Sequence, residues 1–301
     1  MNRIHNLFLI LVFGILTISC NKDDNNSTIA APPRDYAVQY ATDLDSINKY
    51  IDSHYISVDA NHNVTLTLIP NPNPENKVSI RNQQEYPLQY KTVTKNGVDY
   101  QVYYLKLQEG INDSPTAVDS VYVSYKGNLL NDVEFDASPT PLWFQLESVV
   151  SGWAEIIPLF KTGNFDTASG PNPATFSDFG VGVMFLPSGL AYFNRIPSAL
   201  VPQYSPLVFS FKLNKQRYKD HDRDGIFSKD EVDPLNPTQS PLLYDSDGDG
   251  TPNMYDVDDD NDHYLTKVEI LINGSNPSFN AILNCSGTIG GTKKHLDPAC
   301  H

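Results

Sequence analysis

The chain has 301 residues, a length that allows one full hydrophobic core together with smaller units. Its formal net charge at pH 7 is −15, and most of that charge lies in residues 220–269, which hold thirteen Asp and two Glu against three Lys or Arg. A local acidic excess of this kind excludes nucleic acid as a partner, since phosphate groups are bound by basic surfaces.

The first nineteen residues are expected to form a signal peptide. Arg3 and His5 give a short basic start, and the apolar run over 7–18 is too short to span a bilayer comfortably. The run ends in Ser19-Cys20, which resembles the lipobox of bacterial lipoproteins, where the chain is cut before a cysteine that is then acylated. The resemblance implies a signal peptide over 1–19 and membrane attachment through Cys20. The alternative is an ordinary secretory signal with a chance cysteine.

Residues 20–35 follow as the lipid anchor and a polar tether that contains Pro32-Pro33. Within it, Asn21-Lys22-Asp23-Asp24 resembles the surface-export signal of some Gram-negative lipoproteins, and the alternative is a plain polar linker. We therefore expect an outer-membrane lipoprotein that faces the periplasm or the cell surface. No later apolar run is long enough to cross a membrane.

Residues 36–92 are expected to form an N-terminal extension. Apolar side chains recur at spacings of three and four over 36–55, which predicts an amphipathic helix. Val64–Leu68 alternates as a strand does. Three prolines separated by asparagine over 70–74 indicate a loop.

Residues 93–215 are expected to form one α+β domain with an antiparallel sheet, because strands come first, then a short helix, then strands again. Alternation of apolar and polar residues predicts the strands, and residues 126–128 suit a turn. The expected elements are strands over 100–107, 120–125 and 207–213 and a helix over 153–161.

Several motifs of this domain resemble FKBP-type peptidyl-prolyl isomerases in residue type, order and spacing. They are Asp119–Leu130, Glu134–Ser138, Val149–Trp153, Leu186–Tyr192 and Val201–Phe209. The resemblance implies an FKBP-like antiparallel sheet wrapped on a short helix, with a pocket for a proline ring. Trp153 would be the floor of this pocket, Asp136 would stand at its rim, and its walls would be Tyr125, Phe135, Val149, Val150, Tyr192 and Phe209.

The resemblance implies isomerisation of Xaa-Pro bonds in exported proteins. Rotation about a peptide bond has a barrier of about 18–20 kcal/mol, and a dry aromatic pocket lowers it by favouring the twisted amide over the solvated planar form. Such catalysis needs no cofactor. The partners would be proline-containing polypeptides, the membrane through the lipid anchor, and a second copy of the chain, since family members with N-terminal extensions are often dimeric.

Two other functions stay open. One is a non-catalytic surface module that binds proline-containing partners. The other, a part in a motility or secretion machine, rests on analogy alone. Trp153 and Asp136 favour catalysis, whereas Leu142, which stands where an aromatic wall residue is usual, favours the binding module. Two further departures from the family pattern are Phe193 in place of a usual glycine and Pro158 inside the short helix. An insertion over 165–182 is a candidate for a flap that reshapes access to the pocket.

Residues 216–272 carry three acidic segments with one shared spacing. Oxygen-bearing side chains stand at positions 1, 3, 5, 9 and 12, and position 7 offers a backbone carbonyl, as in an EF-hand loop. Like charges this close repel, so the segments should be loose without a cation. The series resembles thrombospondin type 3 repeats and implies structural Ca²⁺, whereas a solvated acidic linker is the alternative. The expected ligands are Asp220, Asp222, Asp224, Ile226, Ser228 and Glu231; Asp245, Asp247, Asp249, Thr251, Asn253 and Asp256; and Asp258, Asp260, Asp262, Tyr264, Thr266 and Glu269.

Residues 273–301 are expected to form a C-terminal tail. Cys285 and Cys300 are predicted to form a disulfide there, because an exported protein meets an oxidising compartment. The alternative is two free thiols.

Overall fold

The structure is a computed structural model, and it describes residues 32–167 and 175–300. The expected signal peptide and Cys20 lie outside the described residues. Residues from Arg34 onward form one compact unit. In the described part of the chain, no helix combines the length and the hydrophobicity that a membrane crossing requires.

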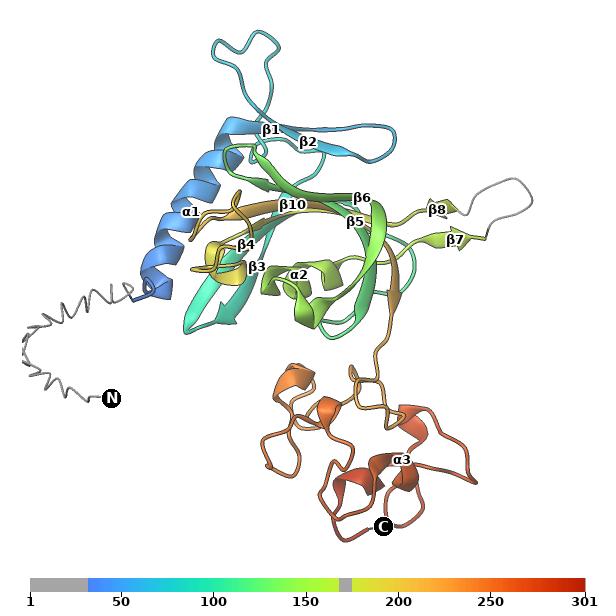
Figure 1. The fold of residues 1–301 in the computed structure, drawn as a ribbon. Helices are drawn as coiled ribbons and strands as arrows, with labels where there is room; N and C mark the ends of the chain where they lie inside the picture. The colour runs from blue at the N-terminus through green and yellow to red at the C-terminus, as the bar shows by residue number, and fades with distance from the viewer. Residues whose placement is uncertain (1–31, 168–174, 301) are drawn as a thin grey trace, which may run out of the picture. The chain divides into compact units, whose positions relative to one another are not determined.

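The centre of the fold is a six-stranded antiparallel sheet with the strand order β3-β4-β9-β10-β5-β6 (Figure 1). It confirms the expected α+β class and the antiparallel sheet. The strands are β3 (Leu88–Lys95), β4 (Val98–Gln108), β5 (Ser120–Leu129), β6 (Glu134–Gln145), β9 (Gly180–Leu186) and β10 (Leu207–Arg217).

The short helix α2 (Ser151–Ile156) packs against one face of this sheet (Figure 1). Its Trp153 and Ile156 share a core with side chains of all six strands of this sheet, including Phe209 of β10. The helix begins earlier than expected and ends sooner. It gives way to a 3₁₀ turn over Ile157–Leu159, because Pro158 has no N–H with which to continue an α-helix.

The N-terminal extension covers the other face of the sheet. Helix α1 (Tyr36–Ser53) is capped by Asp35, which accepts hydrogen bonds from the backbone N–H groups of residues 37 and 38. Next comes a hairpin of β1 (His54–Val58) and β2 (Val64–Leu68), of which β1 was not predicted. The extension and the sheet share one core, made of Ile47, Tyr50, Ile51, Val64, Ile80, Leu105, Val183, Phe185 and Val208.

This shared core corrects the expected division of the chain. The boundary at residue 93 falls inside β3 and separates side chains that pack together. The apolar face of α1 is buried on the chain's own sheet. The homodimer therefore stays a prediction. It would have to form through a surface other than the apolar face of this helix.

Two glycine-containing segments differ from expectation. Residues 126–128 continue β5 instead of forming a turn, which follows at 130–133. The described ends of the predicted insertion form a small hairpin of β7 (Asn164–Asp166) and β8 (Thr175–Ser177), and its last residues already belong to β9. Gly182 lies within β9. A larger residue would not fit at this position, because a Cβ atom there would come 2.4 Å from a ring carbon of Phe160.

The C-terminal region is loop-rich, as expected. Its longest helix among the described residues is α3 (Thr266–Glu269), of four residues. A small core of Ile226, Ile270 and Ile282 joins its loops. Cys285 and Cys300 are joined by a disulfide with a Cα–Cα distance of 5.5 Å, which confirms the expected pairing.

Candidate functional site

An aromatic cluster surrounds Trp153 near the start of α2. The rings of Tyr125, Phe144 and Phe209 stand edge-on to the indole, with centroid distances of 5.1, 5.5 and 5.3 Å, an arrangement that aromatic rings favour. The indole is 3% exposed, and its Nε1 atom has no hydrogen-bond partner among the described residues. The expected floor of the pocket is thus in place, and it carries one unused donor.

The other predicted pocket residues join the same core. Phe135 stands edge-on to Phe209 with centroids 5.6 Å apart, and Val149 and Tyr192 are half-buried against the cluster. Val150 is buried and immediately precedes α2. The structure therefore brings together every residue predicted to line the pocket, although their own rings cover the indole more fully than an open cup requires.

Gly127 of β5 makes room for this cluster. A Cβ atom at this position would lie 2.7 Å from Cζ of Phe135 and 2.8 Å from Cε1 of Phe209. Such distances are far below van der Waals contact, so any side chain here would push the two rings apart.

The polar rim is formed by Asp136. Its exposed carboxylate accepts a hydrogen bond of 2.6 Å from the Tyr125 hydroxyl. Burial, and then this bond, raise the pKa of Tyr125, and burial followed by the charge of Asp136 raises the pKa of Tyr192. Both phenols therefore stay protonated at neutral pH and keep a donor at the edge of the site.

Phe144 is a member of the cluster that the motif analysis missed. The wall was expected to be thin because Leu142 occupies the family's aromatic position. The structure shows Leu142 to be 50% exposed, while Phe144 lies edge-on to both Tyr125 (5.6 Å) and Trp153. Phe144 pairs with Val121 of β5 and Leu142 with Val123, so the two side chains lie on the same side of β6, and the ring of Phe144 is the one that reaches Trp153. The wall is thus aromatic after all.

Phe193, next to Tyr192, takes the place of a usual glycine and keeps the backbone conformation that glycine favours. Its φ of +52° is in the left-handed region that glycine prefers. Its ring stacks on Tyr36 of α1 at a centroid distance of 4.0 Å and meets the edge of Tyr204 at 5.0 Å. These contacts offset the backbone strain and attach the Tyr192 segment to the N-terminal extension.

The predicted flap lies elsewhere than expected in its described part. Phe176 of β8 contacts the ring of Tyr122 at 5.8 Å, and the Lys215 Nζ atom lies 3.2 Å from the ring centroid of Phe165. Within residues 164–166 and 175–177, the ring contacts are among Phe165, Phe176, Tyr122 and Lys215 and not with the cluster around Trp153.

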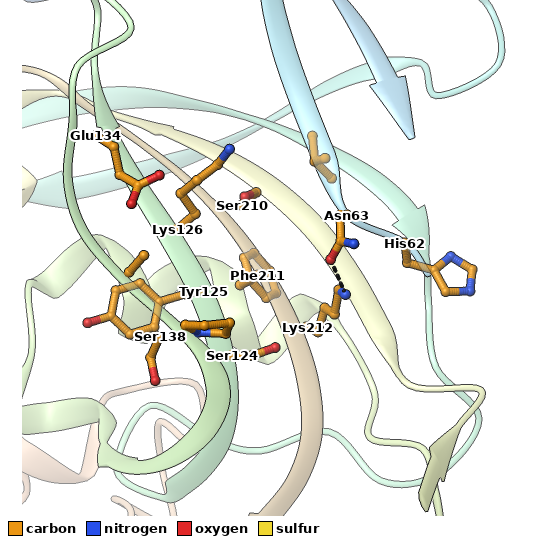
Figure 2. A pocket seen from close by; sticks show the side chains of 13 residues that line it. His62, Asn63, Ser124, Tyr125, Lys126, Glu134, Ser138, Ser210, Phe211 and Lys212 are labelled. Atoms are coloured by element: carbon orange, nitrogen blue, oxygen red, sulfur yellow. Dashed lines mark hydrogen bonds between the residues drawn. The ribbon is translucent and has the colours of Figure 1, made fainter. Parts of the chain in front are cut away.

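A separate hollow of about 510 Å³ lies beside the hairpin loop of β1 and β2 (Figure 2). His62, Lys126, Glu134 and other mostly polar side chains line it, and Tyr125 is a member that also belongs to the aromatic cluster. Lys212 crosses it to bond Asn63 Oδ1 at 2.7 Å, and burial lowers the pKa of this lysine. The sequence carried no motif for this hollow.

The acidic segments form three loops in which carboxylates converge. In each loop the side chains at positions 1, 3 and 5 place ligand oxygens within 4.8 Å of one another. These are Asp220, Asp222 and Asp224; Asp245, Asp247 and Asp249; and Asp258, Asp260 and Asp262.

Backbone N–H groups orient these carboxylates. Asp222 Oδ1 accepts from residue 224 at 3.1 Å and Asp224 Oδ1 accepts from residue 226 at 2.7 Å, while the Oδ2 atoms of both are buried and lack a hydrogen-bond partner in the described chain. Position 6 turns back through a left-handed conformation, at φ +104° in Gly225 and φ +100° in Gly250. His263 takes the same kind of conformation, at φ +77°, in the third loop. The third loop therefore keeps the turn without the glycine.

Positions 7 and 9 mainly hold the loops together. At position 7, Ile226, Thr251 and Tyr264 each donate a backbone N–H to the carboxylate two residues earlier, at 2.7 Å. At position 9, the side-chain oxygens of Ser228, Asn253 and Thr266 accept the backbone N–H of position 2, at 3.2, 2.8 and 3.1 Å. The side-chain oxygens at position 9 thus all bind a backbone N–H group, and Ser228 and Asn253 also contact the side chain at position 2.

The position 12 residues differ among the loops. Glu231 and Glu269 are each 4% exposed, and in both of them neither carboxylate oxygen is within reach of a described donor. Burial, and then neighbouring carboxylates, raise their pKa values to about 10 and about 8. Asp256 in the second loop instead accepts a backbone N–H at 3.0 Å. The first and third loops therefore contain the deeper sites.

A histidine connects the first loop to the aromatic domain. His221, at position 2, has its Nδ1 2.8 Å from Ser228 Oγ and its Nε2 3.2 Å from Glu147 Oε1. Glu147 stands two residues before Val149. Side-chain contacts through His221 thus connect the first loop to Glu147, which lies in the segment just before the aromatic cluster.

Comparison with known proteins identifies two regions. Residues 112–214 match the family model described as FKBP-type peptidyl-prolyl cis-trans isomerase. Residues 221–290 match a model described as BamM C-terminal. The second is a different domain from the thrombospondin type 3 repeat, so that resemblance is not confirmed.

The curated relatives match about two fifths of this chain. Peptidyl-prolyl cis-trans isomerase Mip of Coxiella burnetii is 31% identical over 121 residues, which are 39% of this chain and 44% of that protein. FKBP-type peptidyl-prolyl cis-trans isomerase FkpA of Escherichia coli K12 is 32% identical over 124 residues, or 40% and 38% of the two chains. This chain thus spans less than half the length of these relatives. A crystal structure of an isomerase from Pseudomonas syringae pv. tomato covers 62% of this chain and 98% of its own, with 18% identity and a TM-score of 0.38.

Proposed function

We propose that the FKBP-type domain of this chain is a peptidyl-prolyl cis-trans isomerase that acts on proline-containing polypeptides. The observation that carries the proposal is the ring cluster centred on Trp153, with Asp136 and Tyr125 hydrogen-bonded at its rim. The reaction breaks no covalent bond, so it needs neither a nucleophile nor a cofactor. Its requirement is an apolar surface for the proline ring and a donor near the amide as conjugation is lost.

Each part of the cluster has a place in this chemistry. The aromatic edges around the indole exclude water and contact the ring, which disfavours the solvated planar amide. The hydroxyl of the half-buried Tyr192 is a donor for the carbonyl of the twisting bond. Asp136 orients the Tyr125 hydroxyl at the rim.

The covered indole favours a second candidate, a non-catalytic module that binds proline-containing segments. With 3% of its surface exposed, Trp153 offers a ring less contact than an open pocket would. The two candidates share a binding site and differ in turnover alone.

An exchange experiment separates them. The cis–trans exchange rate of a Xaa-Pro peptide is followed by NMR with the chain from residue 21 onward and with Trp153→Ala. Trp143→Ala is a matched control, because this second tryptophan is 42% exposed and stacks near Tyr122 and Arg217. Catalysis by the wild type and Trp143→Ala, lost in Trp153→Ala, supports the isomerase. Peptide binding without faster exchange leaves the binding module.

We also propose that the acidic loops bind structural Ca²⁺. The converging carboxylates and the buried oxygens without partners support this, because a hard cation with six to eight oxygen ligands would neutralise them. Calorimetric titration with CaCl₂, and protease resistance with and without chelator, test it. Heat of binding together with stronger protection is the expected result, and the absence of both would leave an acidic linker.

Export and lipidation at Cys20 remain proposals supported by the sequence of residues 1–24 alone. They place the chain on the outer membrane, facing the periplasm or the cell surface. Fractionation of cells that express the wild type or Cys20→Ser tests them. Loss of the membrane-bound form in Cys20→Ser is expected, and equal membrane association of both forms would exclude the anchor.

A further inference from the structure

Asp259 is a buried carboxylate that no loop position accounts for. It is the second residue of the third acidic loop, so it lies between the predicted ligands Asp258 and Asp260 and outside the repeat of ligand positions. It is 1% exposed, and neither of its carboxylate oxygens accepts a hydrogen bond from a donor in the described chain. A lone carboxylate in this state is costly, because burial removes its hydration.

The carboxylate of Asp259 faces the first loop. Ligand oxygens of Asp224, Glu231 and Asp259 all lie within 4.8 Å of one another, and each of the three residues is less than 5% exposed. Asp224 Oδ2 and both oxygens of Glu231 also lack donors among the described residues. Three acids from two loops therefore meet at one point in the interior.

The main chain at Asp259 is fixed by the other two loops. Its N–H donates to the Thr266 hydroxyl of the third loop at 3.1 Å, and its carbonyl accepts from the Ser246 hydroxyl of the second. With its backbone held on both sides, the direction of its side chain toward the first loop is set by the fold. This orientation is that of a ligand rather than of a surface acid.

A basic partner does not explain the cluster. The main charges acting on Asp259 are those of Asp224, Asp222 and Asp256, and those acting on Glu231 include Asp222, Asp224 and Asp259, all of them acidic. Mutual repulsion of buried carboxylates would open the loops unless a positive charge lies among them.

We propose that Asp224, Glu231 and Asp259 bind a divalent cation that ties the first loop to the third. This inference rests on the proposed Ca²⁺ binding of the loops and adds to it a ligand that the loop spacing does not predict. Carboxylates can bridge neighbouring cations, so Asp224 can serve both this site and the site formed with Asp220 and Asp222. The cation would convert three separate loops into one body.

Calorimetric titration with CaCl₂ tests the site in the chain from residue 21 onward, with Asp259→Asn as the variant. The exchange keeps the size of the side chain and removes its charge. We expect one ion fewer per chain, or at least a tenfold weaker Kd at one site. Asp230→Asn is the matched control, because Asp230 is an acid of the first loop that pairs with Lys229 at 2.7 Å instead of facing the cluster. It should titrate like the wild type.

Thermal unfolding of the same chains gives a second readout. Without calcium, Asp259→Asn should be at least as stable as the wild type, because a source of repulsion is gone, and the rise in Tm on adding calcium should be smaller than in the wild type. Equal ion number, affinity and calcium-dependent Tm shift in the wild type and Asp259→Asn would overturn the cross-loop site while the loop sites stand. If the wild type binds no calcium, the proposed calcium loops fail and this inference fails with them.

Discussion

The carboxylate of Asp43, in helix α1, accepts two hydrogen bonds from Ser188: one of 2.7 Å from the backbone N–H and one of 2.6 Å from the hydroxyl. Both residues are buried, and the second oxygen of Asp43 accepts a bond of 2.6 Å from Gln39. Ser188 begins the turn that leads to Tyr192. The N-terminal helix therefore fixes one wall of the aromatic site.

Asp43→Ala should destabilise the whole compact unit. It leaves the Ser188 and Gln39 donors buried without an acceptor, which should lower the free energy of unfolding by about 3 kcal/mol. Urea unfolding measures this change. Asp45→Ala is the control, since Asp45 is 63% exposed in its pair with Lys49 and should change stability by less than about 0.5 kcal/mol. Equal losses in both variants would contradict the role of Asp43.

Phe144→Ala should impair the site more than Leu142→Ala, although the two residues stand in the same strand. Removal of the Phe144 ring opens a gap beside Trp153, and we expect roughly a tenfold lower rate of catalysed exchange, or about 1.4 kcal/mol. Leu142 is 50% exposed, and its loss should leave the rate nearly unchanged. Peptide exchange by NMR compares the two, and a larger effect of Leu142→Ala would restore it as the wall residue.

Tyr125→Phe tests the rim. The change keeps the ring against Trp153 and removes the bond of 2.6 Å to Asp136. Because Asp136 is exposed and can be hydrated, stability should fall by less than about 1 kcal/mol, while kcat/KM for a Xaa-Pro peptide should fall about fivefold. Tyr122→Phe is a control from the same strand, with its ring near Trp143 instead. Unchanged kcat/KM in Tyr125→Phe would remove the rim pair from the mechanism.

His295 should make the C-terminal region sensitive to acid. It is 2% exposed, and burial, and then the charge of Lys293, lower its pKa to about 3. The unfolded chain takes up this proton at about pH 6.5, so below that pH the unfolded state binds more protons than the folded one. Stability should therefore fall as the pH drops from about 6.5 toward 3, by up to about 1.4 kcal/mol per pH unit.

The measurement for His295 is thermal unfolding at several pH values in saturating calcium, with His295→Gln as the comparison. The variant should lose less stability between pH 6.5 and 4.5 than the wild type does. Parallel curves would mean that His295 is protonated equally easily in both states.

The sequence predicted β2, β4, β5, β10 and the pocket residues because each depends on local information, whereas β1, β3 and β6 were not predicted. Alternation identified β4 and β10, and short motifs placed Tyr125, Phe135 and Trp153 in the correct order. Phe144 was missed because the motif places the wall residue at position 142, and alternation cannot reveal which of two residues on the same side of a strand contacts Trp153.

Interactions across long separations were also beyond the sequence. Asp43 and Ser188 are 145 residues apart, and although Ser188 lies in the motif Leu186–Tyr192, nothing in the sequence relates it to Asp43. The same holds for Asp259, whose neighbours in the sequence are predicted ligands but whose carboxylate faces a different loop. The spacing of the acidic residues predicts the ligands within each loop. The contacts between loops are visible only in the tertiary structure.

The shared core beneath α1 limits how this chain can be shortened for study. A fragment cut to the matched residues 112–214 would lack α1, β3 and β4, and Val183, Phe185 and Val208 would face water. Such a patch favours aggregation. Soluble material for assays or crystallisation therefore calls for a starting point at or before Arg34.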